Sequence, residues 1–556
     1  MKSKATQFIK KSTEKTKFIY LLTVLVSGVQ SALMVFFALS TKDLINSALS
    51  DSSELKTVLF RAGISIILLI FAFLFSVLDK IMIEKCRLTC EVNLKKEVFS
   101  KLLNKDYAKI SEYKTGDLVG RITTDSQIIA RGYSQILPAF VAMIVKVVLA
   151  VGVLLYYQPI FTLFLVFGGL VIVGASFLVR KLFKKLHRKT REKESEAVSY
   201  LTENTSNLLA VKVFSVEYKV SSLGSKKFDE YLKTAKKQRY IASLLTSALS
   251  FAFSFFYIAT VVWGAINLLN GSSGVTFGLI TAMIQLVNQL QAPFMNFTQI
   301  FTVYYEMLSS AERILEVIDI KDEQKSSEDD RINYSDIRSI SAKNLTFSYG
   351  REKVIDNASF EIKKGDFCLI KGISGIGKST LFKLLLGVYD DYQGELYFET
   401  ENSKKKITSS DRSLFAFVPQ GNMLFSGTIR ENVCFLNDSA TEEEIMVAAE
   451  ISCMDFLDSL PQGLDTVIGE NGQGLSEGQG QRVAICRALL SKKPIILLDE
   501  ATSALDEETE IKVLKSIKEK LENDTTLIII SHKMVAKDIC NVQMTIKDRC
   551  VELKRY

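Results

Sequence analysis

The chain of 556 residues is too long to form one hydrophobic core, so we expect at least two domains. A mean hydropathy of +0.18 together with 24% charged residues is unusual for a uniformly soluble protein and predicts apolar segments that alternate with charged ones. The formal net charge of +7 does not indicate a nucleic-acid partner, because Lys and Arg flank the apolar segments instead of gathering on one compact domain.

The first apolar run covers residues 18–39. Its length of about 22 residues lets a helix cross a hydrocarbon core about 30 Å thick, and it is too long for the apolar core of a signal peptide. Five similar runs follow, at 62–78, 136–157, 160–179, 241–269 and 275–294. The sequence therefore predicts an all-α transmembrane domain of six helices over residues 1–318.

The connections between these runs predict the orientation in the membrane. The two long connections, 79–135 and 180–240, are rich in Lys and Arg, as cytoplasmic loops are, and their apolar residues recur at helical spacing. Lysines also precede the first run, so we expect both termini in the cytosol. All eight cysteines fall in segments predicted to be cytosolic, which indicates a reduced compartment, and Cys86 and Cys90 are expected to be inert thiols on a helix surface.

The character of the sequence changes at residues 319–336, a polar stretch without apolar periodicity that we interpret as a linker. Beyond it, residues 337–556 alternate strand-like runs with helical stretches. This alternation predicts an α/β domain with a largely parallel sheet. The strand-like runs are 344–348, 367–370, 494–498 and 526–530.

A glycine-rich loop follows the run 367–370 and precedes an apolar helical stretch, which is the setting of a phosphate-binding loop. Glycines let backbone amides approach phosphates, and the helix N-terminus adds about half a positive charge. We expect Lys378 to contact the β- and γ-phosphates of ATP and Ser379 to hold Mg²⁺. The nucleotide-binding residues predicted in this loop are Gly372, Ile373, Ser374, Gly375, Ile376, Gly377, Lys378, Ser379 and Thr380.

Two carboxylates end the apolar run 494–498. Asp499 is placed to bind Mg²⁺, and Glu500 is placed to accept a proton from the water that attacks the phosphoanhydride. The structural alternative is an acidic pair that faces solvent at the end of a strand. Together with the phosphate loop, the pair predicts an α/β P-loop ATPase domain.

Between these two motifs lies Leu475-Ser476-Glu477-Gly478-Gln479, and with it the chain resembles an ABC transporter of the exporter type. The resemblance covers both halves of the chain, and the motifs of the second half stand in the family order. It implies that Tyr349 stacks on adenine, that Gln420 contacts Mg²⁺ and that His532 contacts the γ-phosphate. The implied catalytic residues are Glu500, His532 and Lys378, the implied metal ligands are Ser379, Gln420 and Asp499, and the implied signature and D-loop residues are Ser476, Gly478, Gln479 and Asp506.

The resemblance also implies a dimer of half-transporters, in which the signature residues of one chain bind the ATP held by its partner. A homodimer is favoured over a heterodimer because Ser476, Gly478 and Glu500 are intact, although Glu477 stands where glycine is usual. The implied function is ATP-driven export of an amphipathic or hydrophobic peptide, drug or lipid. An ABC-type sensor or regulatory partner that hydrolyses ATP without net transport is the alternative.

Polar residues inside the predicted spans bear on the cargo. Lys146 lies near the middle of the third run, and Gln285, Asn288 and Gln289 share one face of the sixth. They indicate either a pathway for an amphipathic or partly anionic cargo, or hydrogen bonds between helices and a lysine that reaches towards cytosolic water. A composition rich in Lys and Ile favours the plasma membrane of a bacterium and, with it, a peptide or drug as the cargo, and we expect no peptidase domain ahead of residue 18.

Two stretches of the long connections resemble the coupling regions of such exporters. Residues 115–125 resemble the segment that follows the first coupling helix, and residues 203–214 resemble the neighbourhood of the second. We expect them to transmit movements of the ATPase domain to the membrane helices.

Overall fold

The computed structural model describes residues 2–50, 54–270, 275–323, 332–350, 352–421, 423–521, 524–531, 533 and 535–556, and it gives only the backbone of 2–3, 170–173, 175–184, 292–299, 471 and 535. These residues form two compact units. One comprises Met1–Leu103 with Lys114–Asp319, and the other comprises Asn104–Tyr113 with Ile320–Tyr556. The chain therefore passes between the units after residues 103, 113 and 319.

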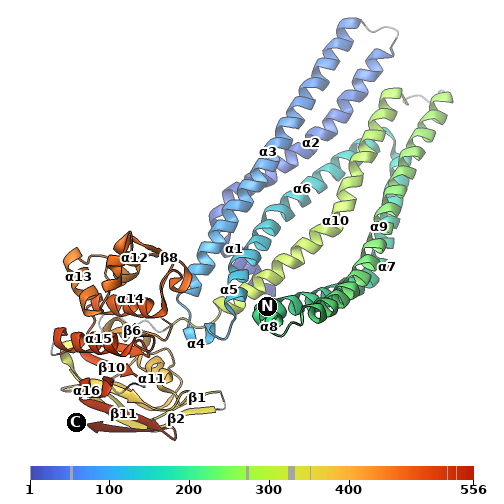
Figure 1. Ribbon diagram of the computed structural model, residues 1–556. Coiled ribbons are helices and arrows are strands. Elements are labelled where there is room, and N and C mark those ends of the chain that lie inside the picture. Colours follow the sequence, from blue (N-terminus) through green and yellow to red (C-terminus); the bar gives the residue numbers. More distant parts are fainter. Residues whose placement is uncertain are drawn as a thin grey trace. The chain divides into compact units, whose positions relative to one another are not determined.

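The first unit consists of helices, several of them more than 30 residues long (Figure 1). Its elements in chain order are α1 (Lys2–Ser12), η1 (Glu14–Thr16), α2 (Lys17–Ala48), α3 (Leu55–Leu102), α5 (Thr115–Gly120), η2 (Arg121–Asp125), α6 (Ser126–Tyr157), α7 (Pro159–Ser206), α8 (Leu208–Val213), α9 (Glu217–Leu269) and α10 (Phe277–Ile318). The short turn η2 is a π-helix, inserted where α5 continues into α6.

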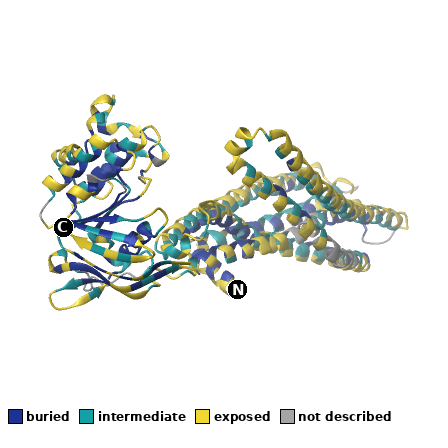
Figure 2. Ribbon diagram, turned by 60° about the horizontal axis from the view of Figure 1, so that its bottom comes forward, coloured by how far each residue is buried: buried dark blue, intermediate teal, exposed yellow. Residues whose placement is uncertain are grey.

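Four of the six predicted membrane runs lie on helices that are long and apolar enough to cross a membrane. These helices are Glu14–Ala48, Leu55–Leu102, Thr115–Tyr157 and Glu217–Leu269. Only 11% of the most apolar stretch of Leu55–Leu102 is buried, so most of its Ile, Leu and Phe side chains are exposed, as expected for contact with lipid. Figure 2 shows many exposed residues along the helices of the first unit. The runs 160–179 and 275–294 fall on α7 and α10, whose side chains are described only in part, so these two spans stay predictions.

Two clusters of buried side chains hold the helices of the first unit together. In one, Leu94 and Val98 of α3 pack with residues of α1, α6 and α10. In the other, α2, α6 and α10 pack around side chains such as Leu154 and Leu286. The expectation of surface thiols at Cys86 and Cys90 is wrong, because both are buried: with Leu94 and Val98 they form an i, i+4 stripe on the inner face of α3.

The second unit contains three sheets. A six-stranded sheet has the order β12-β11-β3-β10-β9-β6, a four-stranded sheet the order β2-β1-β4-β5, and β7 pairs with β8. The strands are β1 (Ile337–Tyr349), β2 (Glu352–Lys363), β3 (Phe367–Lys371), β4 (Gln393–Thr400), β5 (Lys404–Lys406), β6 (Phe415–Val418), β7 (Gly427–Thr428), β8 (Val467–Ile468), β9 (Ile495–Asp499), β10 (Thr526–Ile530), β11 (Val542–Lys547) and β12 (Cys550–Arg555).

Helices and short 3₁₀ turns accompany these sheets. The helices are α4 (Tyr107–Ile110), α11 (Lys378–Leu385), α12 (Ile429–Cys434), α13 (Glu442–Ile451), α14 (Glu477–Leu490), α15 (Glu507–Lys520) and α16 (Val535–Ile539). The 3₁₀ turns are η4 (Tyr334–Asp336), η5 (Ser409–Leu414), η6 (Asp455–Ser459), η7 (Gly463–Asp465) and η8 (Glu470–Gly472).

The predicted parallel sheet is the six-stranded one, where β11, β3, β10, β9 and β6 run parallel and only β12 is antiparallel. Every residue of β9 and β10 is buried, as is typical of parallel strands covered on both faces. The predicted strand 344–348 instead lies in β1, within an antiparallel sheet. Part of the predicted linker, 324–331, lies outside the described residues.

Candidate functional site

Four parallel strands of the six-stranded sheet bring their carboxyl ends to one edge. In the register, Ile370 of β3 lies opposite Ile530 of β10, and Ile530 lies opposite Asp499 of β9. On the other side of β9, Val418 of β6 lies opposite Leu498. The segments that follow these strands therefore begin side by side, and they carry the predicted phosphate loop, Glu500, Gln420 and His532.

The predicted phosphate loop connects β3 to α11. Gly377 has a φ of 109°, in the left-handed region, and a Cβ added there would lie 2.6 Å from the Cγ1 of Val354. A side chain at this position would thus be strained and would clash with β2. The glycine lets the loop turn into α11 directly above the strand, while Ile373, Ser374 and Gly375 are exposed.

The Lys378 side chain is buried inside this loop. Its Nζ donates hydrogen bonds to the carbonyl oxygens of Gly372 at 2.9 Å and Ile373 at 3.3 Å. Burial lowers the pKa of Lys378, although the charges of Glu500 and Asp499 oppose the shift. An ammonium group that has lost part of its water is poised to pair with an anion, and a phosphate group meets that need.

Asp499 lies next to Ser379, at the first turn of α11. The Oγ of Ser379 donates a hydrogen bond to Oδ1 of Asp499 at 3.1 Å. The carboxyl of Asp499 is 4% exposed, and this burial raises its pKa above the usual range, with the Ser379 hydrogen bond acting in the opposite direction. A hydroxyl and a carboxylate in contact at the head of a phosphate loop form a donor set that fits Mg²⁺.

Glu500 directly follows β9 in an unusual backbone conformation. Its φ is 50°, which costs a non-glycine residue about 1–3 kcal/mol. Its amide donates to the carbonyl of Ile530 at 3.1 Å, and its Oε2 accepts a hydrogen bond from Nε2 of Gln420 at 3.0 Å. The strained turn therefore directs the Glu500 carboxylate towards Gln420, in the segment after β6. Asp499 and Glu500 are thus more than an acidic pair that faces solvent at the end of a strand.

Tyr349 ends β1 and belongs to an aromatic group near the same loop. Its hydroxyl lies 3.3 Å from Oγ1 of Thr380, and its ring lies edge-on to Tyr389 with centroids 5.4 Å apart. Burial, together with Tyr349, raises the pKa of Tyr389 to about 12. The ring of Tyr349 is 42% exposed and so remains accessible to a planar base.

The predicted signature residues lie at the N-terminus of α14. Oγ of Ser476 accepts the amide of Gln479 at 3.2 Å, and Oε1 of Gln479 accepts the amide of Ser476 at 2.8 Å, so the two make a capping box. A Cβ added to Gly478 would lie 2.9 Å from the carbonyl oxygen of Ala504, so only glycine allows this close approach. Glu477 is exposed in the first turn, where the helix dipole favours a negative charge.

Asp506, which is predicted to belong to the D-loop, caps the N-terminus of α15. Its carboxylate accepts hydrogen bonds from the amide and the hydroxyl of Thr509, and these bonds lower its pKa. Gln481 fastens the D-loop to α14, because it donates to Oγ of Ser503 at 3.0 Å and accepts from the amide of Ala504 at 3.0 Å. The predicted His532 lies outside the described residues.

The structure thus brings the loop of Lys378 together with Ser379, Asp499, Glu500 and Gln420 at one edge of the sheet. The signature helix α14 and the D-loop contact each other, and Figure 1 shows α14 and α11 in different parts of the second unit. Two residues of these arrangements were missed by sequence reasoning, Tyr389 and Gln481. No spacing rule singles them out, because both act through contacts with distant segments of the chain.

Comparison with known proteins agrees with this arrangement. Residues 18–294 match the family model of the ABC transporter transmembrane region, and residues 355–503 match the ABC transporter model. An ATP-dependent lipid A-core flippase of Desulfotalea psychrophila is 30% identical over 521 residues, which cover 92% of this chain and 89% of that protein. The chain belongs to the ABC transporters of the exporter type.

Other relatives support the same family. A putative export ATP-binding/permease protein of Rickettsia bellii is 32% identical over 86% of this chain and 82% of its own length. The structure of a bacterial Atm1-family ABC exporter with ATP bound has the same fold, with a TM-score of 0.80, 23% identity and coverage of 98% and 95% of the two chains. This ABC exporter is therefore a multi-pass membrane protein that binds ATP and couples its hydrolysis to export. This confirms the predicted helical membrane domain, the α/β ATPase domain and the activity, while the number of six membrane helices stays a prediction.

The buried charge of Asp499 predicts how stability depends on pH. Because burial raises the pKa of this carboxyl in the folded state, its ionisation destabilises the nucleotide-free protein at neutral pH, and this penalty disappears as pH falls through the raised pKa. Asp499→Asn should raise the free energy of unfolding at pH 7, within the roughly 0.5–2 kcal/mol of common stabilising substitutions. Thermal unfolding of the nucleotide-free protein between pH 7 and pH 4 measures the difference in stability between wild type and Asp499→Asn.

Asp506→Asn is the control. It removes an exposed carboxylate of lowered pKa and should therefore destabilise the protein at pH 7. If wild type is more stable than Asp499→Asn at pH 7, the buried charge of Asp499 does not destabilise the nucleotide-free protein, and the prediction is wrong.

Proposed function

We propose that two copies of this ABC exporter form a homodimer that moves an amphipathic, anionic lipid-like cargo across the plasma membrane of a bacterium. The observation that supports the catalytic part is the continuous line of contacts from Ser379 through Asp499 to Glu500 and Gln420 at the carboxyl edge of the sheet. The proposed domain borders are 1–318, 319–336 and 337–556, with both termini in the cytosol.

At the nucleotide, each residue has a defined role in this proposal. Tyr349 stacks on adenine, the loop of Gly372 to Thr380 surrounds the phosphates, and Lys378 leaves its backbone carbonyls to pair with the β- and γ-phosphates. Ser379, Asp499 and Gln420 hold Mg²⁺, which neutralises charge that develops on the phosphates when it is bound. Glu500 accepts the proton of the attacking water, and His532 contacts the γ-phosphate.

Completion of the site needs a second chain. Ser476 and Gly478 stand at the N-terminus of a 14-residue helix, whose free amides and dipole attract an anion. Since α14 and α11 belong to different parts of the unit, we assign the γ-phosphate that Ser476, Gly478 and Gln479 bind to the ATP of the partner chain. Asp506 and the D-loop, fastened to α14 through Gln481, lie at the same contact. ATP then holds the two copies together, and its hydrolysis releases them.

Mixed dimers test whether the sites are shared between chains. A dimer of one Lys378→Ala chain and one Ser476→Ala chain retains one intact site if the signature acts on the partner's ATP, and none if it acts within its own chain. We expect the co-expressed, doubly tagged and purified mixed dimer to hydrolyse ATP well above either parent dimer, both of which should be inactive. A mixed dimer as inactive as its parents, although folded and dimeric, would contradict the shared site.

The cargo assignment rests on the polar side chains of the membrane helices. Gln285 accepts a hydrogen bond from Thr41 at 3.3 Å and Gln289 donates one to the carbonyl of Met34 at 3.1 Å, so both act between α10 and α2. Lys146 of α6 has no hydrogen bond or ion pair among the described side chains. An ammonium group that is half buried in a membrane helix is stabilised by an anionic partner, and the flippase relative acts on a lipid by its name. We therefore propose that Lys146 receives an anionic headgroup.

Substitution of Lys146 tests this assignment. Lys146→Ala should lower the ATP-driven translocation of a fluorescent anionic phospholipid in proteoliposomes about tenfold, since a hydrogen bond to a charged group contributes about 1.5–3 kcal/mol. Lys146→Arg should retain most of the activity. Lys56→Ala, which removes an exposed lysine of α3, is the control. Equal translocation by wild type and Lys146→Ala, for anionic and zwitterionic lipids alike, would exclude a role of this lysine with lipid cargo.

A further inference from the structure

The three places where the chain passes between the two units lie close to charged contacts. The passages follow residues 103, 113 and 319. On the side of the first unit, an ion-pair network joins the segment after residue 113 to the end of α10. On the side of the second unit, paired backbone joins the segment after residue 103 to the segment after residue 319. Each of the three segments that connect the units is thus held by noncovalent contacts to another of them.

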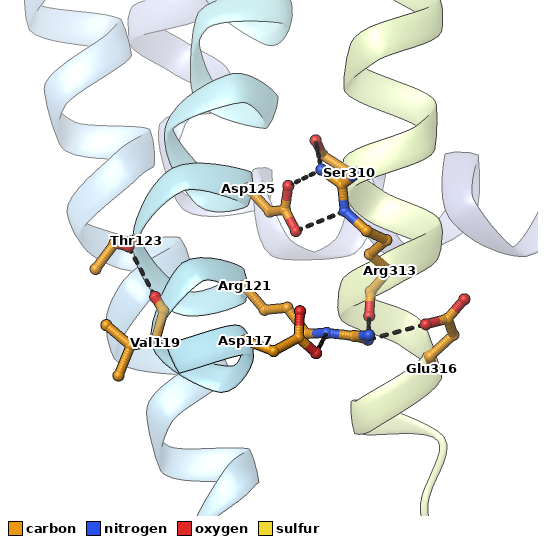
Figure 3. A network of polar contacts seen from close by, with 8 residues as sticks. All are labelled: Asp117, Val119, Arg121, Thr123, Asp125, Ser310, Arg313 and Glu316. Atoms are coloured by element: carbon orange, nitrogen blue, oxygen red, sulfur yellow. Dashed lines mark hydrogen bonds and ion pairs between the residues drawn. The ribbon is translucent and has the colours of Figure 1, made fainter. Parts of the chain in front are cut away.

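The network of the first unit, which we call the crossing clamp, consists of Asp117, Arg121, Asp125, Arg313 and Glu316 (Figure 3). Arg313 of α10 forms a two-pronged ion pair with Asp125, and its Nε lies 3.0 Å from Oδ2 of that carboxylate. Arg121 donates to Asp117 at 2.9 Å, to Glu316 at 3.0 Å and to the carbonyl of Arg313. The crossing clamp therefore joins α5 and η2, which lead into α6, to the end of α10.

Two of the five residues of the crossing clamp are buried, and the other three are about half exposed. The carboxylate of Asp125 is 3% exposed and Arg121 is 9% exposed, so loss of a partner would leave a charge without water around it. The π-turn η2 carries both residues at its two ends, Arg121 and Asp125. We conclude that the start of α6 and the end of α10 are held together as one body.

The paired backbone of the second unit, which we call the crossing tie, joins residues 104–106 to residues 321–323. The amide of Asp106 donates to the carbonyl of Lys321 at 3.0 Å, and the amide of Glu323 donates to the carbonyl of Asn104 at 2.9 Å. The ammonium of Lys105 lies 2.6 Å from the carboxylate of Asp322. Residues 104–106 of the crossing tie lead directly into α4.

Arg412 anchors the crossing tie to the phosphate-loop helix. Its guanidinium forms a two-pronged ion pair with Glu323, at 2.8 Å and 3.2 Å. The same guanidinium donates to the carbonyls of Leu386 and Gly387, at 2.8 Å and 3.1 Å, which follow the last turn of α11. A cation at a helix C-terminus is favourable. The helix whose N-terminus carries Lys378 is therefore linked by its other end to the crossing tie.

We propose that Arg412 and Glu323, through the crossing tie and the crossing clamp of Arg313 with Asp125, pass movements of α11 on to α6 and α10 of the same chain. These four are positioning residues, since they act through other residues and none belongs to the proposed nucleotide site. The inference rests on the proposed role of the α11 loop in binding ATP. Its physical basis is that one set of ion pairs joins the start of α6 to the end of α10, the other set joins residues 104–106 and 321–323 to α11, and the covalent chain connects the two sets.

Hydrogen exchange of the full-length protein in lipid nanodiscs tests the route without knowledge of the cargo. With Mg²⁺ and a non-hydrolysable ATP analogue, wild type should change exchange both at α11 and at the adjoining ends of α6 and α10. Glu323→Gln and Asp125→Asn should keep the change at α11 and reduce the change at α6 and α10 by about fivefold or more, the lower end of typical coupling factors. In the double variant, the change in exchange at α6 and α10 should be no smaller than in the more affected single variant, because both substitutions act on one route.

Controls separate this inference from the function it rests on. Glu230→Gln removes the 2.9 Å ion pair of Lys193 between α7 and α9 and should leave both changes intact. If Asp125→Asn does not fold, as judged by thermal unfolding, Glu316→Gln loosens the same clamp at an exposed position. If the folded Glu323→Gln and clamp variants show the same change in hydrogen exchange at α6 and α10 as wild type, the proposed coupling route is wrong. Absence of any response at α11 in wild type would instead count against the proposed nucleotide site.

Discussion

The register of the parallel sheet is the constraint on which the rest of the structure depends. Because Ile370, Ile530 and Asp499 lie in one row across β3, β10 and β9, the phosphate loop and the two carboxylates must start at the same edge. A slip of one residue in β9 would turn Asp499 to the other face of the sheet, away from Ser379, and would exchange the side chains of β9 between the two cores that cover its faces. The close packing of every residue of β9 and β10 in these cores opposes this slip, so the hydrophobic cores also fix the geometry of the proposed nucleotide site.

The same edge concentrates unfavourable groups that a nucleotide would relieve. A buried ammonium, a buried carboxylate and a glutamate with positive φ all lie within a few residues of the strand ends. Each reduces the stability of the nucleotide-free fold, and each gains a partner or a use when phosphates and a cation bind. The free energy of nucleotide binding is therefore available to move α11. Through its contacts with Leu386 and Glu323, Arg412 connects α11 to the segments that pass between the units.

Local motifs were predictable from the sequence, whereas long-range pairs were not. The phosphate loop and the acidic pair were found because each is a continuous stretch with a strand before it, and the apolar runs of β9 and β10 indicate burial by themselves. The placement of 344–348 in an antiparallel sheet depends on its pairing with β2 and β4, which no local pattern shows. Gln420 and Glu500 are 80 residues apart and Asp125 and Arg313 are 188 apart, so only the folded chain reveals their contacts. The burial of Cys86 and Cys90 likewise depends on which helices α3 meets.

The central claim is that Glu500 at this sheet edge cleaves ATP and that the cleavage drives export. It is tested most directly by simultaneous measurement of ATP binding, phosphate release and lipid translocation in proteoliposomes that contain wild type or Glu500→Gln. The account predicts that Glu500→Gln binds ATP as tightly as wild type but neither releases phosphate nor translocates lipid. Phosphate release by Glu500→Gln at the wild-type rate, or translocation without phosphate release, would contradict it.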